Sequence, residues 1–234
     1  SIAVGSRGME NLVYLFSCFL SCVIIAGLMF QFMGDRYGKA FENPWLYRIA
    51  AAVAVVIVTL VNLKHNTWWN MAANFSVYGI ASFICYEDKN VRRYWRVMES
   101  ECFFIMLILF EGIGVFGIDL LMEKLSLMPE DVVISNSIEV AFSKLVIVFF
   151  YYVLLRRLWK KDYRQSRTQV ILYLVMFLYS MVNFIILATA VKRKADYFLL
   201  CANLCCVVFA NLYLFYSLKV EDEKNSMEFQ IAMM

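Results

Sequence analysis

Apolar positions dominate the chain in seven long stretches that short polar segments separate. The stretches cover roughly residues 11–33, 49–63, 67–86, 97–120, 138–155, 168–190 and 196–217. Most are about 16–24 residues long, the length at which a helix crosses the hydrocarbon layer of a bilayer. The second is shorter, about 15 residues, and we expect it to use residues 45–48 to reach across. The pattern predicts an all-α, polytopic membrane bundle of about seven transmembrane helices.

Tryptophan and tyrosine gather where these stretches end. Both side chains favour the headgroup level of a membrane, so their positions support the boundaries given above. The residues concerned are Trp45, Tyr47, Trp68, Trp69, Tyr94, Trp95, Trp159 and Tyr163.

The sequence changes character at both of its ends. Residues 1–8 precede Met9 and differ from the rest of the chain, so we interpret them as a leader or an expression remnant. Residues 9–217 hold the seven stretches and form the predicted transmembrane domain. Charged residues then take over, and we interpret residues 218–234 as the start of a cytoplasmic signalling or dimerisation helix.

A short heptad pattern marks that last segment. Val220 and Met227 are seven residues apart, and Ile231 comes four residues after Met227. Apolar residues at this spacing are typical of a helix that pairs with another. We expect Lys219, Val220, Met227 and Ile231 to belong to a helix that pairs.

Charge adds an orientation to this picture. Only 18% of the residues are charged, against about a quarter in soluble domains. The first, third and fifth connections carry thirteen Lys and Arg residues and the alternate connections carry five. Cytoplasmic connections are the basic ones, so the N-terminus is predicted outside and the C-terminus inside the cell. The basic cluster at residues 192–194 argues the other way, and we judge it outvoted. The location predicted is the plasma membrane.

Catalytic signatures are scarce in the chain. His65 is the single histidine and lies in a short connection, and no HExxH, GxSxG or phosphate-binding glycine loop occurs. Cys85 lies about 30 Å from His65 along one helix, too far for a nucleophile and its base. The seven cysteines show no pairing pattern and are interpreted as reduced, buried side chains. We therefore assign no catalytic residue, metal site or cofactor to this chain.

Two further functions are disfavoured by single features. A retinal protein needs a buried lysine in its last helix, and none lies between residues 198 and 218. The basic stretch 156–167 stands between two membrane stretches, so it is interpreted as an anchor on anionic lipid and not as a nucleic-acid site.

Two charged residues inside apolar stretches are the most informative. Glu111 and Lys144 lie in consecutive, antiparallel helices at depths that differ by about 5 Å. An unpaired charge at this depth would cost about 2.5–3.5 kcal/mol. We therefore predict that the two side chains pair or line a polar cavity, either to fix helix register or to sense a ligand.

Other polar residues complete the set of candidates. Six asparagines at membrane depth are expected to join helices by hydrogen bonds. They are Asn62, Asn70, Asn74, Asn183, Asn203 and Asn211. Glu139, near the predicted outer rim, faces either solvent or a ligand. The ligand-binding or switch candidates are Glu111, Lys144, Asn183 and Glu139.

Several short motifs are similar to those of a known receptor family. They are Arg36-Tyr-Gly-Lys, Leu60-Val-Asn, Tyr78-Gly-Ile-Ala-Ser, Glu111, Phe142-Ser-Lys-Leu and the Leu212-Tyr-Leu-Phe-Tyr exit into a charged helix. Together they resemble the membrane sensor region of peptide-pheromone histidine kinases of the accessory-gene-regulator type, from Gram-positive bacteria. The kinase domain of that family belongs to the GHKL ATPase group. The resemblance covers residues 9–234.

The resemblance implies a homodimer with six or seven spanning helices that binds a secreted peptide outside the cell. It implies that residues 219–234, with Lys219, Val220, Met227 and Ile231 as the signal relay, pass the signal to a cytoplasmic kinase. That kinase uses ATP and Mg²⁺ and acts on a response regulator. Neither the phosphoacceptor helix nor the ATP-binding domain lies in these 234 residues, so the chain by itself has no kinase chemistry. The alternatives are a small membrane carrier or uptake-transporter subunit and, less favoured, an intramembrane enzyme.

Overall fold

The computed structural model describes residues 2–64, 66–88, 91–125, 132–158, 175–176, 178–180, 182–183 and 197–232. Within them the chain is almost entirely helical. The long helices are α1 (Ile2–Arg36), α2 (Pro44–Asn62), α3 (Thr67–Cys85), α4 (Arg93–Lys124), α5 (Val132–Phe150) and α8 (Tyr197–Ala232). A π-helical turn, η1 (Tyr151–Leu155), joins α5 to the short α6 (Arg156–Leu158). The strands β1 (Gly38–Lys39) and β2 (Tyr86–Glu87) pair antiparallel, with Gly38 opposite Glu87.

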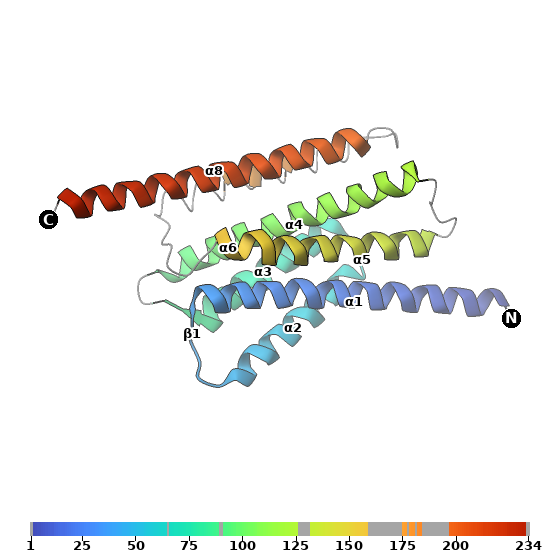
Figure 1. Ribbon diagram of the computed structural model, residues 1–234. Coiled ribbons are helices and arrows are strands. Elements are labelled where there is room, and N and C mark those ends of the chain that lie inside the picture. Colours follow the sequence, from blue (N-terminus) through green and yellow to red (C-terminus); the bar gives the residue numbers. More distant parts are fainter. Residues whose placement is uncertain are drawn as a thin grey trace.

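Helices α1 to α5 run up and down through the bundle in succession (Figure 1). Their direction places β1, β2 and α6 at one end, which we call the clasp end. The start of α5 and the start of α8 lie at the opposite end. Helix α8 runs in the same direction as α1 and extends past the other helices at the clasp end.

Helix α4 lies at the centre of the bundle. It packs against α1, α3, α5 and α8. Half of the residues in its apolar span are buried, against a third or less in the spans of α1, α2 and α5. Aromatic rings stack across two of its contacts, Phe32 on Phe103 with centroids 3.9 Å apart and Phe110 on Phe150 at 4.3 Å. The core is therefore organised around α4, and a movement of this helix would change its contacts with all four of these neighbours.

The starts of α2 and α3 are set by asparagine caps. The Asn43 side chain accepts a hydrogen bond from the backbone N–H of Trp45 at 3.0 Å, and Pro44 takes the first helical position. The Asn66 side chain accepts from the backbone of Trp68 and Trp69 at 3.1 and 3.2 Å. Helix α2 thus includes residues 45–48, as the short second stretch predicted.

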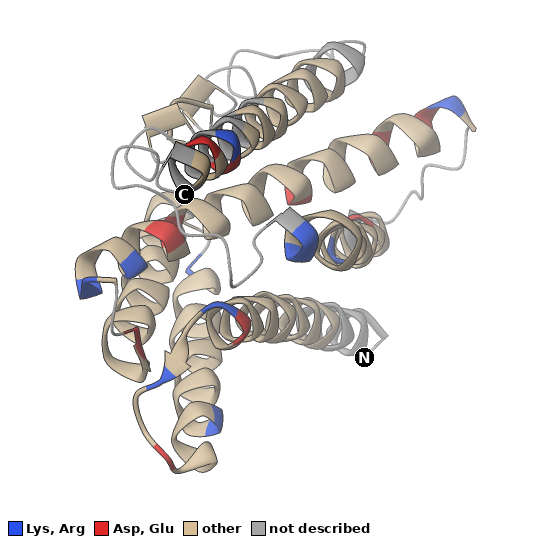
Figure 2. Cartoon of the chain, turned by 60° about the vertical axis from the view of Figure 1, so that its left-hand side comes forward, with Lys and Arg blue, Asp and Glu red and all other residues tan. Residues whose placement is uncertain are grey.

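The outward faces of the helices are apolar. Large side chains such as Leu12, Phe16, Leu60, Leu145 and Phe209 are exposed along them. Figure 2 shows charged residues mostly near helix ends, with long uncharged stretches between. Four helices, Leu12–Arg36, Pro44–Asn62, Arg93–Lys124 and Ile134–Leu155, are long and apolar enough to cross a membrane. A surface of this kind is stable in lipid and is typical of a membrane protein.

The expected count of seven spans is not supported in the described part of the chain, where four helices qualify. The third stretch does form a helix, α3, but its first half carries Trp68, Trp69, Asn70 and Asn74 and is too polar to qualify. The seventh contributes a shorter apolar helix, Cys201–Tyr213, within α8. Most of the sixth stretch lies outside the described residues.

The connection between the fourth and fifth stretches, residues 121–137 by the apolar pattern, is shorter in the structure. Helix α4 continues to Lys124 and α5 begins at Val132, because apolar residues continue the helical pattern on both sides. Lys124 in the last turn also favours the helix C-terminus through the backbone dipole. Residues 126–131 of this connection lie outside the described residues.

Helix α8 is continuous from the apolar part into the charged part of the chain. Neither glycine nor proline interrupts residues 197–232, and Lys224 forms an i,i+4 ion pair with Glu228 at 3.8 Å. The prediction that the last helix continues beyond Ser217 is confirmed. Its location in the cytoplasm and its pairing stay predictions.

Candidate functional site

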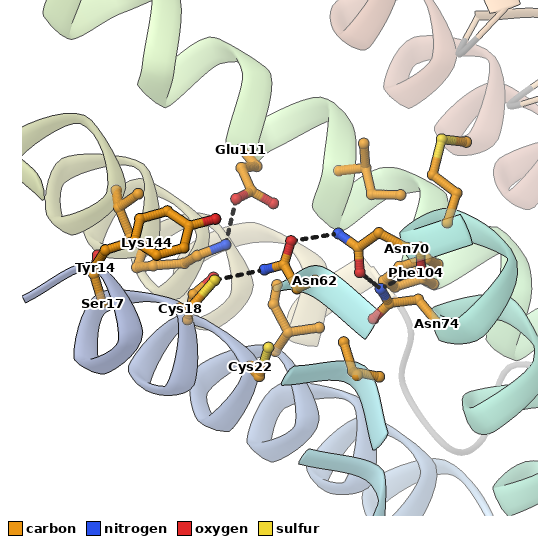
Figure 3. Close-up of a pocket in the computed structure, with 16 residues that line it drawn as sticks. Tyr14, Ser17, Cys18, Cys22, Asn62, Asn70, Asn74, Phe104, Glu111 and Lys144 are labelled. Atoms are coloured by element: carbon orange, nitrogen blue, oxygen red, sulfur yellow. Dashed lines mark hydrogen bonds and ion pairs between the residues drawn. The ribbon is translucent and has the colours of Figure 1, made fainter. Parts of the chain in front are cut away.

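A cavity of about 450 Å³ lies between α1, α2, α3, α4 and α5. Figure 3 shows its polar residues pointing toward one another from these helices. On α1 the lining begins at Tyr14 and ends at Ile25, so it stops about 16 Å short of the clasp end at 1.5 Å per residue. The cavity therefore belongs to the half of the bundle opposite the clasp end.

Glu111 on α4 and Lys144 on α5 meet at the edge of this cavity (Figure 3). The Lys144 Nζ donates a hydrogen bond to Glu111 Oε1, so the predicted pairing is confirmed. Their surroundings differ, since the Lys144 side chain is 5% exposed and that of Glu111 is 33% exposed. The ammonium is thus enclosed by protein, and the carboxylate keeps one side open.

The two helices approach closely beside this pair. A Cβ added to Gly114 would lie 2.6 Å from Ser143 Cα, so only glycine permits this contact. Gly114 is one turn from Glu111, and Ser143 is the neighbour of Lys144. The crossing of α4 and α5 therefore holds the pair at a fixed separation.

A chain of side-chain hydrogen bonds forms another wall of the cavity. Asn74 Nδ2 donates to Asn70 Oδ1 at 3.0 Å, Asn70 Nδ2 donates to Asn62 Oδ1 at 3.2 Å, and Asn62 Nδ2 donates to Cys18 Sγ at 3.0 Å. The chain joins α3, α2 and α1, as expected of amides at membrane depth. Asn211 likewise donates to Ser180 Oγ at 2.7 Å, from α8 to the sixth stretch.

The remaining wall combines apolar and small polar side chains. Ile25, Val58, Met71, Phe104 and Ile108 provide the apolar part. The hydroxyl-bearing residues are Tyr14, Ser17 and Ser21. A concave, largely apolar site with a few convergent polar groups is the usual form of a small-ligand site.

The other two candidates from the sequence do not line this cavity. Glu139 is half-buried on α5 and accepts a hydrogen bond from Ser135 Oγ at 3.3 Å. Asn183 is helical and half-buried in the sixth stretch. Only Glu111 and Lys144 of the four candidates are brought together in this site.

The predicted relay residues all lie in α8. Val220, Met227 and Ile231 are exposed there, and Lys219 lies within the same helix. These three exposed apolar side chains form a surface suited to packing against another helix.

A second polar cluster was missed by reasoning from the sequence. Arg36 Nε, at the end of α1, donates to Glu99 Oε1 on α4 at 3.0 Å, and the Tyr37 hydroxyl donates to Glu99 Oε2. All three residues are buried. Burial and then the negative charge of Glu99 raise the pKa of Tyr37 well above its usual range, so the phenol stays protonated and remains a donor. We call Arg36, Tyr37 and Glu99 the clasp.

Basic residues near the clasp are not simple surface anchors. Arg96 is 2% exposed and donates to the backbone oxygens of Tyr86 at 2.8 Å and Val91 at 3.1 Å. It thus secures the β2 segment, while Tyr86 donates to the Phe30 carbonyl at 3.1 Å. Arg36 and Arg96 counted toward orientation in the sequence, but their burial here gives them a structural role.

The signal for the clasp was present in the sequence. Glu99 comes soon after a basic connection and stands at the start of an apolar stretch, where an acidic side chain needs a partner. Its partner, Arg36 on α1, is 63 residues away in the sequence. The packing of α1 on α4 brings the two together, and local sequence does not show this packing.

Among the described residues, no group of three His, Cys, Asp or Glu side chains is arranged to hold a metal ion. The chemistry that the cavity offers is binding: one carboxylate with an open side, one enclosed ammonium, amides and apolar surface. Comparison of the chain with protein families, curated proteins and solved structures yields no match.

Proposed function

We propose that this chain is the membrane sensor region of a receptor that binds an extracellular ligand in the cavity and reports binding through α8. The observation that carries the proposal is the position of the two features. The cavity lies in one half of the bundle, and α8 extends from the opposite end (Figure 1). A ligand at one side of a membrane and a response at the other need this arrangement.

Helix α4 offers a physical route between the two. Glu111, Phe104 and Ile108 of α4 line the cavity, and α4 also packs against α8. Leu204 and Val208 of α8 are buried in the same core. A ligand that binds one arrangement of α4 better than another would shift the equilibrium between the two arrangements, and α8 would move with α4. The size of that shift is set by the difference in the ligand's affinity for the two states.

The orientation proposed rests on the distribution of basic residues, with the clasp end in the cytoplasm and the cavity facing outward in the plasma membrane. We further propose seven crossings, with the sixth stretch and α3 among them. The polar half of α3 is compatible with this, since Asn70 and Asn74 form their hydrogen bonds inside the bundle.

The resemblance to peptide-pheromone sensor kinases defines the specific form of the proposal. The ligand is then a secreted peptide, the receptor a homodimer, and α8 leads to a GHKL-type histidine kinase that uses ATP and Mg²⁺ and acts on a response regulator. The exposed residues Val220, Met227 and Ile231 supply a face for helix pairing in this arrangement.

The reading frame of the natural gene beyond Met234 tests this proposal directly. We expect it to continue into a helix that bears a histidine and then an ATPase domain. In cells that carry the full gene, Lys144→Met should abolish the response to the peptide at normal expression. A stop codon directly after Met234, or an undiminished response, would contradict the proposal.

A small membrane carrier is the second candidate, and the size of the cavity favours it. About 450 Å³ is within the range of roughly 300–1,000 Å³ typical of small-molecule sites. A peptide receptor would admit only a few side chains into this space, whereas a carrier would enclose its whole substrate. Uptake of a labelled small molecule into proteoliposomes that contain this chain alone would support the carrier and oppose the receptor.

A further inference from the structure

We infer that the cavity accepts a ligand with an uncharged hydrogen-bond-donating head, of the amide type, on an apolar body. This inference rests on the proposed function in one respect, namely that the cavity is a ligand site. It adds the chemical class of the ligand and names Glu111 as the group that receives its head.

The difference in exposure within the ion pair determines which partner a ligand meets. Lys144 lines the cavity, but only 5% of its side chain is accessible, whereas 33% of the Glu111 side chain is accessible. Lys144 contacts Oε1 of the carboxylate. A carboxylate accepts at both of its oxygens, so a donor can bind on the open side without breaking the pair. The arriving group is therefore a donor.

The amide chain on the opposite wall adds a further acceptor. Each of its members uses Nδ2 to donate toward the next, from Asn74 through Asn70 and Asn62 to Cys18. Within the described part of the chain, the Asn74 carboxamide oxygen at the start of this series receives no hydrogen bond. The cavity thus offers acceptors on α3 and α4. Both N–H groups of Asn74 are used, whereas Asn62 and Asn70 each keep a second N–H that can donate to the carbonyl of an amide head.

The net charge of the cavity decides between a neutral and a charged head. Glu111 and Lys144 are the only carboxylate and ammonium among its described lining residues, and their charges cancel. A cation would leave water for a site of zero net charge, where desolvation is not repaid by a countercharge. A neutral N–H keeps the hydrogen bond to the carboxylate without this penalty. The apolar wall of Ile25, Val58, Met71, Phe104 and Ile108 accommodates the body.

Four fluorinated probes of the same shape test the inference: 4-fluorobenzamide, 4-fluorobenzoate, 4-fluorobenzylammonium and 4-fluorotoluene. Binding to the protein in nanodiscs is measured by ¹⁹F line broadening. The double variant Glu111→Met/Lys144→Met serves as the control, because it keeps zero net charge. The broadening measured with it reports partition of each probe into lipid, and this value is subtracted. We expect the benzamide to bind the natural sequence about tenfold or more tightly than the other three probes, and to lose this advantage in the control.

The exchanged pair Glu111→Lys/Lys144→Glu provides a second test that keeps an ion pair. It presents the ammonium to the cavity at unchanged net charge, so a neutral probe that only accepts, 4-fluoroacetophenone, should gain affinity relative to the benzamide, while the charged benzoate stays weak. Tighter binding of the benzylammonium, or equal broadening in the natural protein and the apolar control, would overturn the inference. A receptor response that fails while the benzamide preference persists would count against the proposed function and leave the ligand class intact.

Discussion

At the scale of single residues, the Glu111–Lys144 pair holds two opposite charges at membrane depth by mutual contact. Lys144 is enclosed, and Gly114 and Ser143 fix the helix separation beside it. Removing one partner leaves the other charge buried without compensation, whereas removing both leaves an apolar contact.

Lys144→Met should therefore destabilise the bundle by about 2–4 kcal/mol, because the Glu111 charge loses its partner. Glu111→Met/Lys144→Met should recover most of this loss. Reversible unfolding in mixed micelles gives both values. Equal stability of the single variant and the natural protein would show that the pair contributes nothing to folding.

Gly114→Ala provides a second prediction at this scale. The new Cβ would lie 2.6 Å from Ser143 Cα, so α4 and α5 must separate, at an expected cost of about 1–3 kcal/mol. Gly117→Ala on the same helix is the matched control, since nothing lies within 4 Å of its Cβ. That change should be neutral or stabilising by up to about 1 kcal/mol through helix propensity. Thermal unfolding of both variants side by side makes the comparison.

At the scale of secondary-structure elements, the two ends of the bundle are built differently. At the clasp end, Arg36, Tyr37 and Glu99 tie α1 to α4, and β1 pairs with β2. In the other half, five helices leave a cavity between them. We expect the cavity half to rearrange more readily than the clasp end, because its helices border a cavity, whereas buried hydrogen bonds and strand pairing join the elements of the clasp end.

Tyr37→Phe tests the contribution of the clasp. It removes a donor from the buried Glu99 carboxylate while the ring stays, so we expect a loss of about 1.5–3 kcal/mol. Tyr94→Phe is the control, since Tyr94 is exposed and its ring contact with Trp95 does not need the hydroxyl. Hydrogen exchange should also show faster opening of the β1–β2 segment in Tyr37→Phe. Identical unfolding curves for the two variants would show that the Tyr37 hydroxyl does not contribute to stability.

At the scale of the whole molecule, the directions of the helices show which residues lie at each of the two ends of the bundle. Asp35, next to the clasp, forms an ion pair with Arg156 at 3.3 Å, so both belong to the clasp end. Lys124, at the end of α4, lies at the other. The proposed orientation assigns the first end to the cytoplasm and the second to the outside.

Cysteines introduced one at a time test this orientation in intact cells. A membrane-impermeant thiol reagent should label Lys124→Cys and leave Asp35→Cys, Arg157→Cys and Glu223→Cys unmodified until the cells are lysed. The unsubstituted protein corrects for its own thiols, of which Cys206 is exposed. Labelling of Arg157→Cys and Glu223→Cys from opposite sides would require a different number of crossings.

The sequence by itself predicted lipid as the solvent, the helical stretches that the structure describes, and that Glu111 and Lys144 pair or line a polar cavity. These result from local quantities, namely the length of apolar runs and the depth of a residue along its helix. Tertiary structure alone decided that Glu99 meets Arg36 and that three asparagines and Cys18 form one chain. It also decided that the five helices α1 to α5 line a common cavity. It also decided which member of the ion pair stays open. These features depend on how the helices rotate and tilt against one another, and contacts between distant residues set those angles.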